Sequence, residues 1–231
     1  MARRPSSRLS DSSSAAGFEI YRDPRRKRTS KIVTLGFALV FLAAAGVGGY
    51  AYFADEAMIQ NVKEQNGLAT FSAYILALKG PLPGARQPLL DGLKAESPAL
   101  RGACARACGK YKQDIMVPLL GQLAIQDPVP TVRVAALDGL IHNGESLGVE
   151  RYLCQVLEEE EEQEVLVAAC ETVAKLDLPV QRVFRQLVDL IQDHRGRVAG
   201  AAVRTLKTLT GQEWGNDARS WRNWYLQEYG R

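Results

Sequence analysis

Four cysteines and two histidines are the side chains of this 231-residue chain best suited to metal, redox or nucleophilic chemistry. Cys104 and Cys108 lie four residues apart, which puts both thiols on one face of a helix. A structural zinc site needs four ligands, and no cysteine–histidine pair lies near these two thiols in the sequence. The pattern therefore favours two small buried hydrophobic side chains, and we expect no metal site and no cofactor.

Cys154 and Cys170 form a candidate disulfide. We expect them on the two helices of one hairpin, at similar distances from its turn, and in an oxidising compartment. A disulfide requires Cα atoms within about 7 Å of each other, a separation that the sequence does not specify. The alternative, two free thiols that fill the core, stays open.

No constellation that could catalyse a reaction is visible in the sequence. His142 and His194 are both expected at the ends of hairpins, and no GxSxG, HExxH or glycine-rich phosphate-binding motif occurs. The acidic run at residues 158–162, continued by Glu164, lacks the alternating Asp/Asn/Gly pattern of a calcium loop and is typical of a solvated turn. We expect no catalytic residues and a protein that is not an enzyme.

Charged and aromatic side chains towards the C-terminus are the candidates for partner binding. A basic stretch follows the acidic run, and neighbouring surfaces of opposite charge speed association and select a binding register. The candidate residues are Arg182, Arg185, Arg195, Arg197, Arg204, Lys207, Trp221 and Trp224. Two alternatives stay open: the arginines solvate helix faces or pair with nearby glutamates, and the tryptophans seal the end of a helical array.

An uncharged segment at residues 32–53 predicts a single transmembrane helix. As a helix its 22 residues would extend about 33 Å, enough to cross a bilayer core of roughly 30 Å. Basic residues crowd its N-terminal side, whereas Asp55 and Glu56 follow it, which predicts a cytosolic N-terminus. We therefore expect an uncleaved signal anchor in a bacterial inner (cytoplasmic) membrane, with a periplasmic or otherwise extracytoplasmic C-terminal domain.

The net charge of +3 is distributed unevenly along the chain. Residues 1–31 hold nine Lys/Arg and three Asp/Glu in a Ser-rich and Arg-rich composition, which predicts a disordered basic cytosolic tail. The rest of the chain holds 20 Lys/Arg and 23 Asp/Glu, so we do not expect the body to bind nucleic acid.

Internal repeats with a period near 33 residues indicate how these side chains are positioned. Related apolar segments begin at Leu100, Val132, Val165 and Val198, which lie 32, 33 and 33 residues apart. A second series precedes them, with segments at Leu89, Leu119, Leu153 and Leu187. Because small residues recur near one helical face of the first series, the pattern predicts four hairpins of closely packed helices.

Residues 127–140, DPVPTVRVAALDGL, resemble a short HEAT-like repeat of the kind found in phycobilisome lyases and bacterial scaffold proteins. The resemblance covers about residues 85–211 and implies an all-α fold, a HEAT-like α-solenoid of about four helical hairpins plus cap helices. In HEAT-like families an arginine one place after the repeat anchor commonly ties neighbouring repeats together, which implies a structural role for Arg101 and Arg133. The third repeat departs from the pattern, because Leu166 occupies this place.

Both ends of the array are expected to carry cap helices, because a terminal repeat has no neighbour. Residues 54–84 would form juxtamembrane and N-terminal cap helices, where Leu68, Phe71, Ile75 and Leu78 make a helical stripe. Residues 212–231 would form a C-terminal aromatic cap helix that begins at Asn216 or Asp217.

The sequence predicts a single-pass membrane-anchored scaffold that uses the exported solenoid for protein–protein interaction. Its partners would be one or more proteins, in a membrane complex, and neither nucleic acid nor a small-molecule substrate is expected. A second hypothesis is an accessory structural subunit of a larger membrane protein complex. A third, a lyase-like enzyme, follows only from the distant resemblance.

The topology can be tested by cysteine labelling. A cysteine introduced at Ser12 should react with a membrane-impermeant maleimide only after the cytosolic side is opened, because the basic flank holds the tail inside. Cysteines introduced in residues 54–231 should react from the outside. Labelling of the Ser12 position from the outside would reverse the predicted orientation.

Overall fold

The computed structural model describes residues 49, 51–111, 115–143 and 148–230. The predicted cytosolic tail and almost all of the predicted transmembrane segment, residues 32–53, lie outside these residues. Among the residues that are described, no helix combines the length and apolar character needed to cross a bilayer. The chain forms two compact units, and the division between them falls after Ala51. The architecture described below is that of the second unit, Tyr52–Arg231.

The fold is all-α, as predicted: every regular element in the described ranges is a helix. Residues 51–64 are helical. They are followed by α2 (Ala69–Lys79), α3 (Arg86–Gly92), α4 (Pro98–Gly109), α5 (Met116–Gln126), α6 (Pro130–Leu140), the short 3-10 helix η1 (Ile141–Asn143), α7 (Val149–Glu159), α8 (Gln163–Lys175), α9 (Val180–Leu190), α10 (Gly196–Thr210) and α11 (Ala218–Tyr229).

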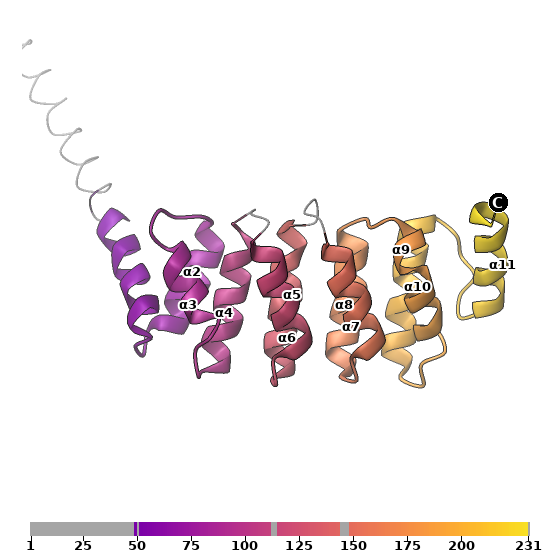
Figure 1. Ribbon diagram of the computed structural model, residues 1–231, viewed down its shortest axis with the longest axis horizontal. Helices are drawn as coiled ribbons and strands as arrows, with labels where there is room; N and C mark the ends of the chain where they lie inside the picture. Colours follow the sequence, from indigo (N-terminus) through magenta and orange to yellow (C-terminus); the bar gives the residue numbers. More distant parts are fainter. Residues whose placement is uncertain (1–48, 50, 112–114, 144–147, 231) are drawn as a thin grey trace, which may run out of the picture. The chain divides into compact units, whose positions relative to one another are not determined.

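The helices pack in two adjacent rows (Figure 1). The first row contains α2, α4, α6, α8 and α10, and each of these helices packs against the next. In the second row α5 packs on α7, α7 on α9, and α9 on α11. Successive helices α3/α4, α5/α6, α7/α8 and α9/α10 pack against each other across the rows, so each pair forms a hairpin.

Turn residues set where the second helix of a hairpin begins. Ser97 precedes α4, and its hydroxyl accepts a hydrogen bond from the Leu100 amide at 3.4 Å. Pro98 and Pro130 occupy the first positions of α4 and α6, where a missing backbone N–H costs nothing. At the other end of α10, Gly211 has a φ of 70° and terminates the helix in the left-handed conformation.

Small side chains allow the first-row helices to approach closely. Ala103, Ala135 and Ala201, at equivalent repeat positions, are fully or almost fully buried, whereas Ala168 is only partly buried. At the crossing of α4 and α6, a methyl group on Gly139 would come within 2.6 Å of the carbonyl oxygen of Ala105. The α4–α6 contact therefore depends on the absence of a side chain at this position.

The N-terminal cap contains the predicted helix, but the stripe that indicated it is not the face that packs. Leu68, Phe71 and Leu78 of this stripe are 60, 65 and 82% exposed. The buried face of α2, which packs on α4, consists instead of Ala69, Ser72, Ala73, Leu76 and Ala77. Because α2 is apolar on both sides, periodicity did not distinguish the packed face from the exposed one.

The C-terminal cap forms around one buried tryptophan. Asp217 caps α11 by accepting hydrogen bonds from the amides of Arg219 and Ser220, at 3.0 and 3.2 Å. Trp221 is fully buried, and its indole N–H donates to the Gly215 carbonyl at 2.9 Å. Because α11 packs on α9, it covers the last hairpin of the array from the second row.

Two glycine substitutions should have opposite effects on stability. Gly139→Ala should lower the free energy of unfolding by about 1–3 kcal/mol, because the new methyl group meets the backbone of α4. Gly200→Ala in α10 should raise it by up to about 1 kcal/mol, because the nearest atom is the mobile Arg204 guanidinium at 3.4 Å. Urea unfolding followed by circular dichroism measures both. Equal stability of the two variants would refute the close α4–α6 contact.

Candidate functional site

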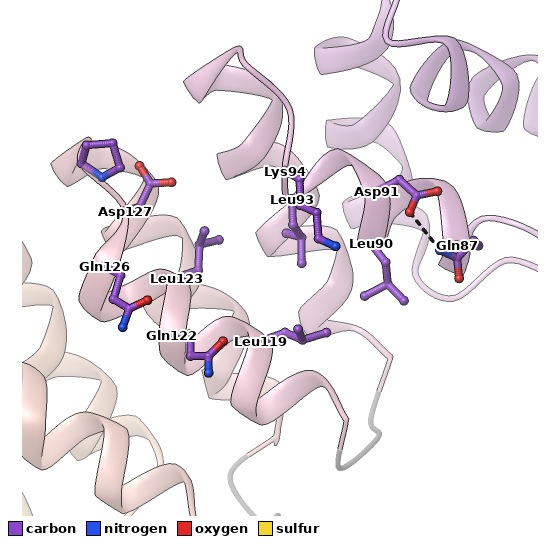
Figure 2. A pocket seen from close by; sticks show the side chains of 11 residues that line it. Gln87, Leu90, Asp91, Leu93, Lys94, Leu119, Gln122, Leu123, Gln126 and Asp127 are labelled. Atoms are coloured by element: carbon purple, nitrogen blue, oxygen red, sulfur yellow. Dashed lines mark hydrogen bonds between the residues drawn. The ribbon is translucent and has the colours of Figure 1, made fainter.

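A groove of about 460 Å³ lies between α3 and α5 in the second row of helices (Figure 2). Leu90 and Leu93 come from α3 and the turn that follows it, and Leu119 and Leu123 come from α5. These leucines are buried or partly buried and form the apolar lining. The groove can therefore accept apolar side chains from another molecule.

The groove exists because α3, the first helix of the first hairpin, is short. α3 has seven residues, whereas α5 has eleven. The preceding segment does not extend α3 towards its N-terminus, because Gly84 adopts a left-handed conformation with a φ of 81° that a helix cannot contain. Elsewhere in the row, α5 and α7 pack directly on each other, as do α7 and α9.

The rim of the groove is polar and carries little net charge. Gln122 and Gln126 project from successive turns of α5 and are exposed (Figure 2). On the opposite wall, Gln87 donates a hydrogen bond from its side-chain amide to Asp91 at 2.9 Å. Carboxamide side chains both donate and accept hydrogen bonds, so this rim can pair with polar groups of either kind.

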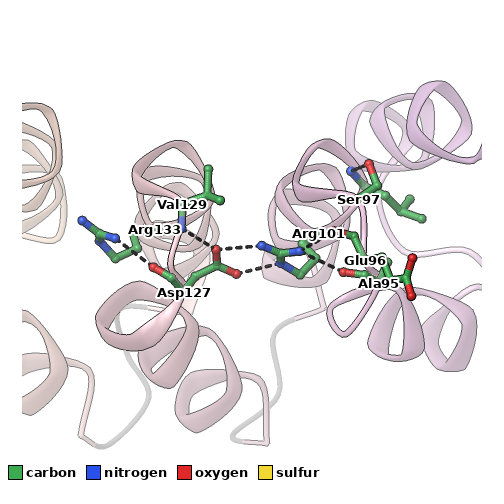
Figure 3. Close-up of polar contacts among 8 residues, drawn as sticks. Ala95, Glu96, Ser97, Arg101, Asp127, Val129 and Arg133 are labelled. Atoms are coloured by element: carbon green, nitrogen blue, oxygen red, sulfur yellow. Dashed lines mark hydrogen bonds and ion pairs between the residues drawn. The ribbon is translucent and has the colours of Figure 1, made fainter.

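Asp127, which lines the groove, forms an ion pair with Arg101 (Figure 3). Arg101 of α4 binds Asp127 through two hydrogen bonds, Nε to Oδ2 at 2.7 Å and Nη2 to Oδ1 at 2.9 Å. Its remaining nitrogen, Nη1, donates to the carbonyls of Ala95 and Glu96, each at 2.9 Å. The side chains of Arg101 and Asp127 are 13 and 3% exposed. Because Arg101 also binds the turn before α4, the pair joins the turns of the first and second hairpins.

The acidity of Asp127 reflects these contacts. Burial raises the pKa of its carboxyl, but hydrogen bonds from Arg101 and the Val129 amide, together with the charges of Arg101 and Arg133, outweigh burial and hold the pKa below its ordinary value. The hydrogen bond to Asp127 correspondingly raises the pKa of Arg101. Both side chains are therefore charged at neutral pH.

The next junction repeats this arrangement. Arg133 of α6 binds Glu160 through Nε–Oε2 and Nη2–Oε1 contacts of 2.7 and 2.9 Å, and its Nη1 donates to the Asp127 carbonyl at 2.8 Å. The structure thus supports the predicted role of Arg101 and Arg133, because each ties its own hairpin to the next. It also identifies their partners, Asp127 and Glu160.

The third junction uses a different arginine. Leu166 cannot form the ion pair, and Asp193 in the following turn is bound instead by Arg195 of the same turn, with Nη2–Oδ2 at 2.6 Å and Nε–Oδ1 at 2.8 Å. Arg195 also donates through Nη1 to the Glu161 carbonyl of the preceding hairpin. The hydrogen bond from Arg195 is the main reason that the pKa of Asp193 falls to about 2.

The candidate basic residues are spread over both helices of the last hairpin and the turn between them, and most of them pair with carboxylates. Arg182 pairs with Glu150, Arg185 is 4.0 Å from Asp189, Arg195 pairs with Asp193, Arg197 with Glu164 and Lys207 with Glu213. Arg204 is exposed on α10. Five of the six candidate residues therefore form ion pairs with acidic residues, and partner binding at these residues stays a prediction.

The two candidate tryptophans differ in accessibility. Trp221 is buried in the cap, whereas Trp224 is partly exposed and packs edge-on against Trp221, with ring centroids 6.2 Å apart. Tyr225 stacks on Phe184 of α9 at a centroid distance of 4.0 Å. The aromatic cluster thus joins α11 to α9, as the alternative of a sealing cap predicts.

The candidate disulfide between Cys154 and Cys170 is not formed, and the cysteines among the described residues are free thiols. Cys154 of α7 lies 3.3 Å from the Arg182 carbonyl, so its thiol faces α9, whereas Cys170 is buried in α8. Burial raises the pKa of the thiols of Cys104 and Cys170 to about 12 and also raises that of Cys108. These protonated thiols fill the core.

Acidic and histidine side chains do not assemble a metal site in the described parts of the chain. Within the acidic run, Glu160 binds Arg133, and Glu158 accepts a hydrogen bond from Gln186 at 2.9 Å. His142 lies 2.8 Å from the Lys110 ammonium, and His194 is exposed beside Asp193.

Sequence reasoning missed the groove. A groove forms where two neighbouring helices do not pack against each other, and neither apolar periodicity nor repeat spacing predicts which helices these are. Two signals were present: the Gly/Pro-rich segment before α3, where Gly84 breaks the helix, and the pair Gln122 and Gln126, which keeps one face of α5 polar beside its leucines.

No family model and no curated protein matches the chain. Among solved structures, the crystal structure of an engineered protein is similar, with 16% sequence identity and a TM-score of 0.51. The similarity covers 76% of this chain and 90% of that chain. At this level of identity it concerns the fold alone.

The buried junction pairs should contribute more to stability than the exposed pairs. Arg133→Gln should lower the free energy of unfolding by about 3 kcal/mol, because it leaves the Glu160 carboxylate, 8% exposed, without its partner. Arg197→Gln should cost less than about 1 kcal/mol, because Arg197 and Glu164 are 66 and 68% exposed. Urea unfolding measures both changes. If Glu160→Gln restored no stability to Arg133→Gln, the assigned pair would be wrong.

Proposed function

We propose that this protein is a membrane-anchored scaffold whose HEAT-like helical solenoid binds a segment of a partner protein. The observation that carries the proposal is the groove between α3 and α5, with its leucine lining and carboxamide rim. An apolar floor between polar walls suits an amphipathic helix, whose apolar face enters the groove while its polar face remains in water.

The solenoid assignment rests on repetition of both packing and polar contacts. Each hairpin of the array packs on the next through two rows of helices. Guanidinium–carboxylate pairs occur at equivalent places in consecutive turns, in Arg101–Asp127 and Arg133–Glu160. Stacked hairpins of this kind present extended surfaces, and proteins built from them commonly act by binding other proteins.

The membrane anchor is proposed from the uncharged segment at residues 32–53 and its basic flank. Tyr52 and Phe53, where this segment ends, are 67 and 72% exposed in the helical unit. Aromatic side chains are enriched at the boundary between membrane and water, so their exposure agrees with a position at the membrane surface.

The groove can be tested by site-specific photo-crosslinking in native membranes. A photoreactive benzoylphenylalanine at Gln122, on the rim, should yield a discrete adduct with one partner. The same residue at Gln181, which is exposed on α9 away from the groove, is the matched control and should yield no such adduct. Leu119→Glu, introduced together with the photoreactive residue at Gln122, should abolish the adduct because it places a charge in the apolar lining.

Circular dichroism of the Leu119→Glu variant controls for folding. Loss of the adduct with unchanged helical content supports binding in the groove. An adduct that survives in the folded variant, or that forms equally from Gln122 and Gln181, would show that the groove is not the binding site.

A further inference from the structure

A second pocket, of about 250 Å³, opens on the first row of helices. It lies where α2, α4 and α6 follow one another, and it shares no lining residue with the groove between α3 and α5. Its walls differ in character, because α2 contributes apolar side chains and the α4 region basic ones. Its lining includes Tyr74 and Leu78 of α2, Arg106 of α4, Lys110 directly after α4, Asp138 of α6 and His142 of η1.

The apolar wall of this pocket is exposed to solvent. Leu78 is 82% exposed and Tyr74 is 45% exposed. Phe71, two turns before Leu78 on the same side of α2, is 65% exposed and extends this apolar surface. Apolar area that remains in contact with water favours a ligand that covers it.

On the opposite wall, Arg106 keeps most of its hydrogen-bonding capacity. Its Nε donates to Asp138 Oδ2 at 3.1 Å, and in the described part of the chain its two Nη nitrogens donate to no acceptor. The junction arginines differ, since Arg101 and Arg133 each use all three of their nitrogens. The pair is also accessible, with the side chains of Arg106 and Asp138 33 and 41% exposed. Four N–H groups of Arg106 are therefore available to an anion.

Lys110 contributes a second cation, which contacts an imidazole and not a carboxylate. Its Nζ lies 2.8 Å from the Nε2 of His142. Because an ammonium group can only donate, Nε2 is the acceptor in this contact, so the imidazole is neutral. The charged groups of the lining are then Arg106 and Lys110 against Asp138 alone. The pocket therefore carries a net positive charge.

We propose that this pocket binds the phosphate group of an anionic phospholipid, which Arg106 and Lys110 hold while Tyr74 and Leu78 contact its apolar part. Guanidinium N–H groups match the geometry of phosphate oxygens, and an ammonium group adds a point charge beside them. A basic pocket next to an exposed apolar surface suits a lipid, because the headgroup and the acyl chain are then both bound at one place.

The location of the pocket in the chain agrees with a lipid ligand, and this step rests on the membrane anchor proposed above. The predicted span ends at Phe53, and Asp55 follows two residues later, within the same compact unit as α2. Lys79, which directly follows Leu78, forms an ion pair with Asp55. Whatever the direction of the span, this contact keeps the pocket end of α2 beside the place where the chain would leave the bilayer.

Ligands without an acyl chain suit the pocket less well. Inorganic phosphate could contact the two cations but would leave Tyr74 and Leu78 in water. A segment of an acidic protein would bring backbone amides against Leu78, which offers no hydrogen-bond partner, and unpaired amides are costly to bury. A phospholipid matches both walls, because its charge and its apolar chains lie at opposite ends of one molecule.

Fluorescence quenching by brominated lipids tests the proposal with the full-length chain in phosphatidylcholine nanodiscs. In a Cys154→Ser background, which removes the partly exposed native thiol, a bimane label attached to the Leu78→Cys variant reports on acyl chains beside the pocket. Half-maximal quenching should require about tenfold less brominated phosphatidylglycerol than brominated phosphatidylcholine, because choline offsets the charge of the phosphate in the second lipid.

Paired substitutions distinguish the two cations of the pocket from the general charge of the protein. Arg106→Gln together with Lys110→Gln should raise the required amount of brominated phosphatidylglycerol about tenfold, to that of phosphatidylcholine. The matched control is Arg204→Gln together with Lys175→Gln, which removes the same charges at equivalent repeat positions of α10 and α8, outside the pocket. It should change the required amount by less than about twofold, because screening weakens distant charges. Circular dichroism checks that the variants keep their helical content.

Three results would overturn the proposal. The first is equal quenching by the two lipids, or no quenching by either. The second is quenching by phosphatidylglycerol that survives in the folded variant with Arg106→Gln and Lys110→Gln. The third is a protein adduct, formed in native membranes by benzoylphenylalanine at Leu78 and lost in the same variant, which would assign the pocket to an acidic protein segment.

Failure of this proposal is distinguishable from failure of the proposed function. Recovery of the chain with the nanodiscs measures the anchor, and adducts at Gln122 measure the groove, and neither measurement involves the pocket. If the chain were not recovered with the nanodiscs, the anchor would be wrong. Vesicles of the same lipids, added to the chain in solution, would then test the pocket with the same label and variants.

Discussion

Burial of one helical face against the next hairpin is the constraint on which the rest of this structure depends. A single hairpin of two short helices cannot cover its own apolar side chains, so each requires a neighbour. Here the requirement is met mainly in the first row, where fully buried alanines such as Ala103 and Ala135, and Gly139, bring successive helices close together. Second-row helices are positioned by the first-row helices with which they pair.

The turns add polar specificity to this apolar packing. Burial of alanine and leucine is non-directional and would tolerate small shifts of one hairpin along another. A bidentate guanidinium–carboxylate contact such as Arg101–Asp127 does not, because both pairs of atoms must be at hydrogen-bonding distance at once. Such contacts fix the relative height of consecutive hairpins.

Local pattern and repeat spacing predicted the helices and the turns, and the resemblance to HEAT-like repeats implied the structural role of Arg101 and Arg133. These are properties of short segments, and residues such as Pro130 or Asp217 act mainly on their own neighbours in the chain. Side-chain orientation was less predictable where a helix is apolar on two sides, as in α2. The replacement of one junction arginine by Arg195 was also missed, because it depends on a turn in which Arg195 binds Asp193, two residues before it.

The candidate site was the least predictable part of the molecule. The clustered charges of the last hairpin made its basic residues candidates for partner binding, yet most of these side chains form ion pairs with neighbouring carboxylates. The groove instead arises from a difference in length between two helices that are not consecutive in sequence. A pattern search along one chain does not compare such helices, so three-dimensional packing was needed to reveal it.

Asp127 takes part in both the groove and the junctions. Its side chain lines the groove and holds Arg101 of the first hairpin, while its backbone carbonyl accepts from Arg133, which in turn holds Glu160 of the third. Three consecutive hairpins are therefore linked through one residue at the edge of the groove. Any displacement of Asp127 by a bound segment would change the spacing of these hairpins. By thermodynamic linkage, bending of the array would in turn alter the affinity of the groove, so that tension along the array and occupancy of the groove would regulate each other.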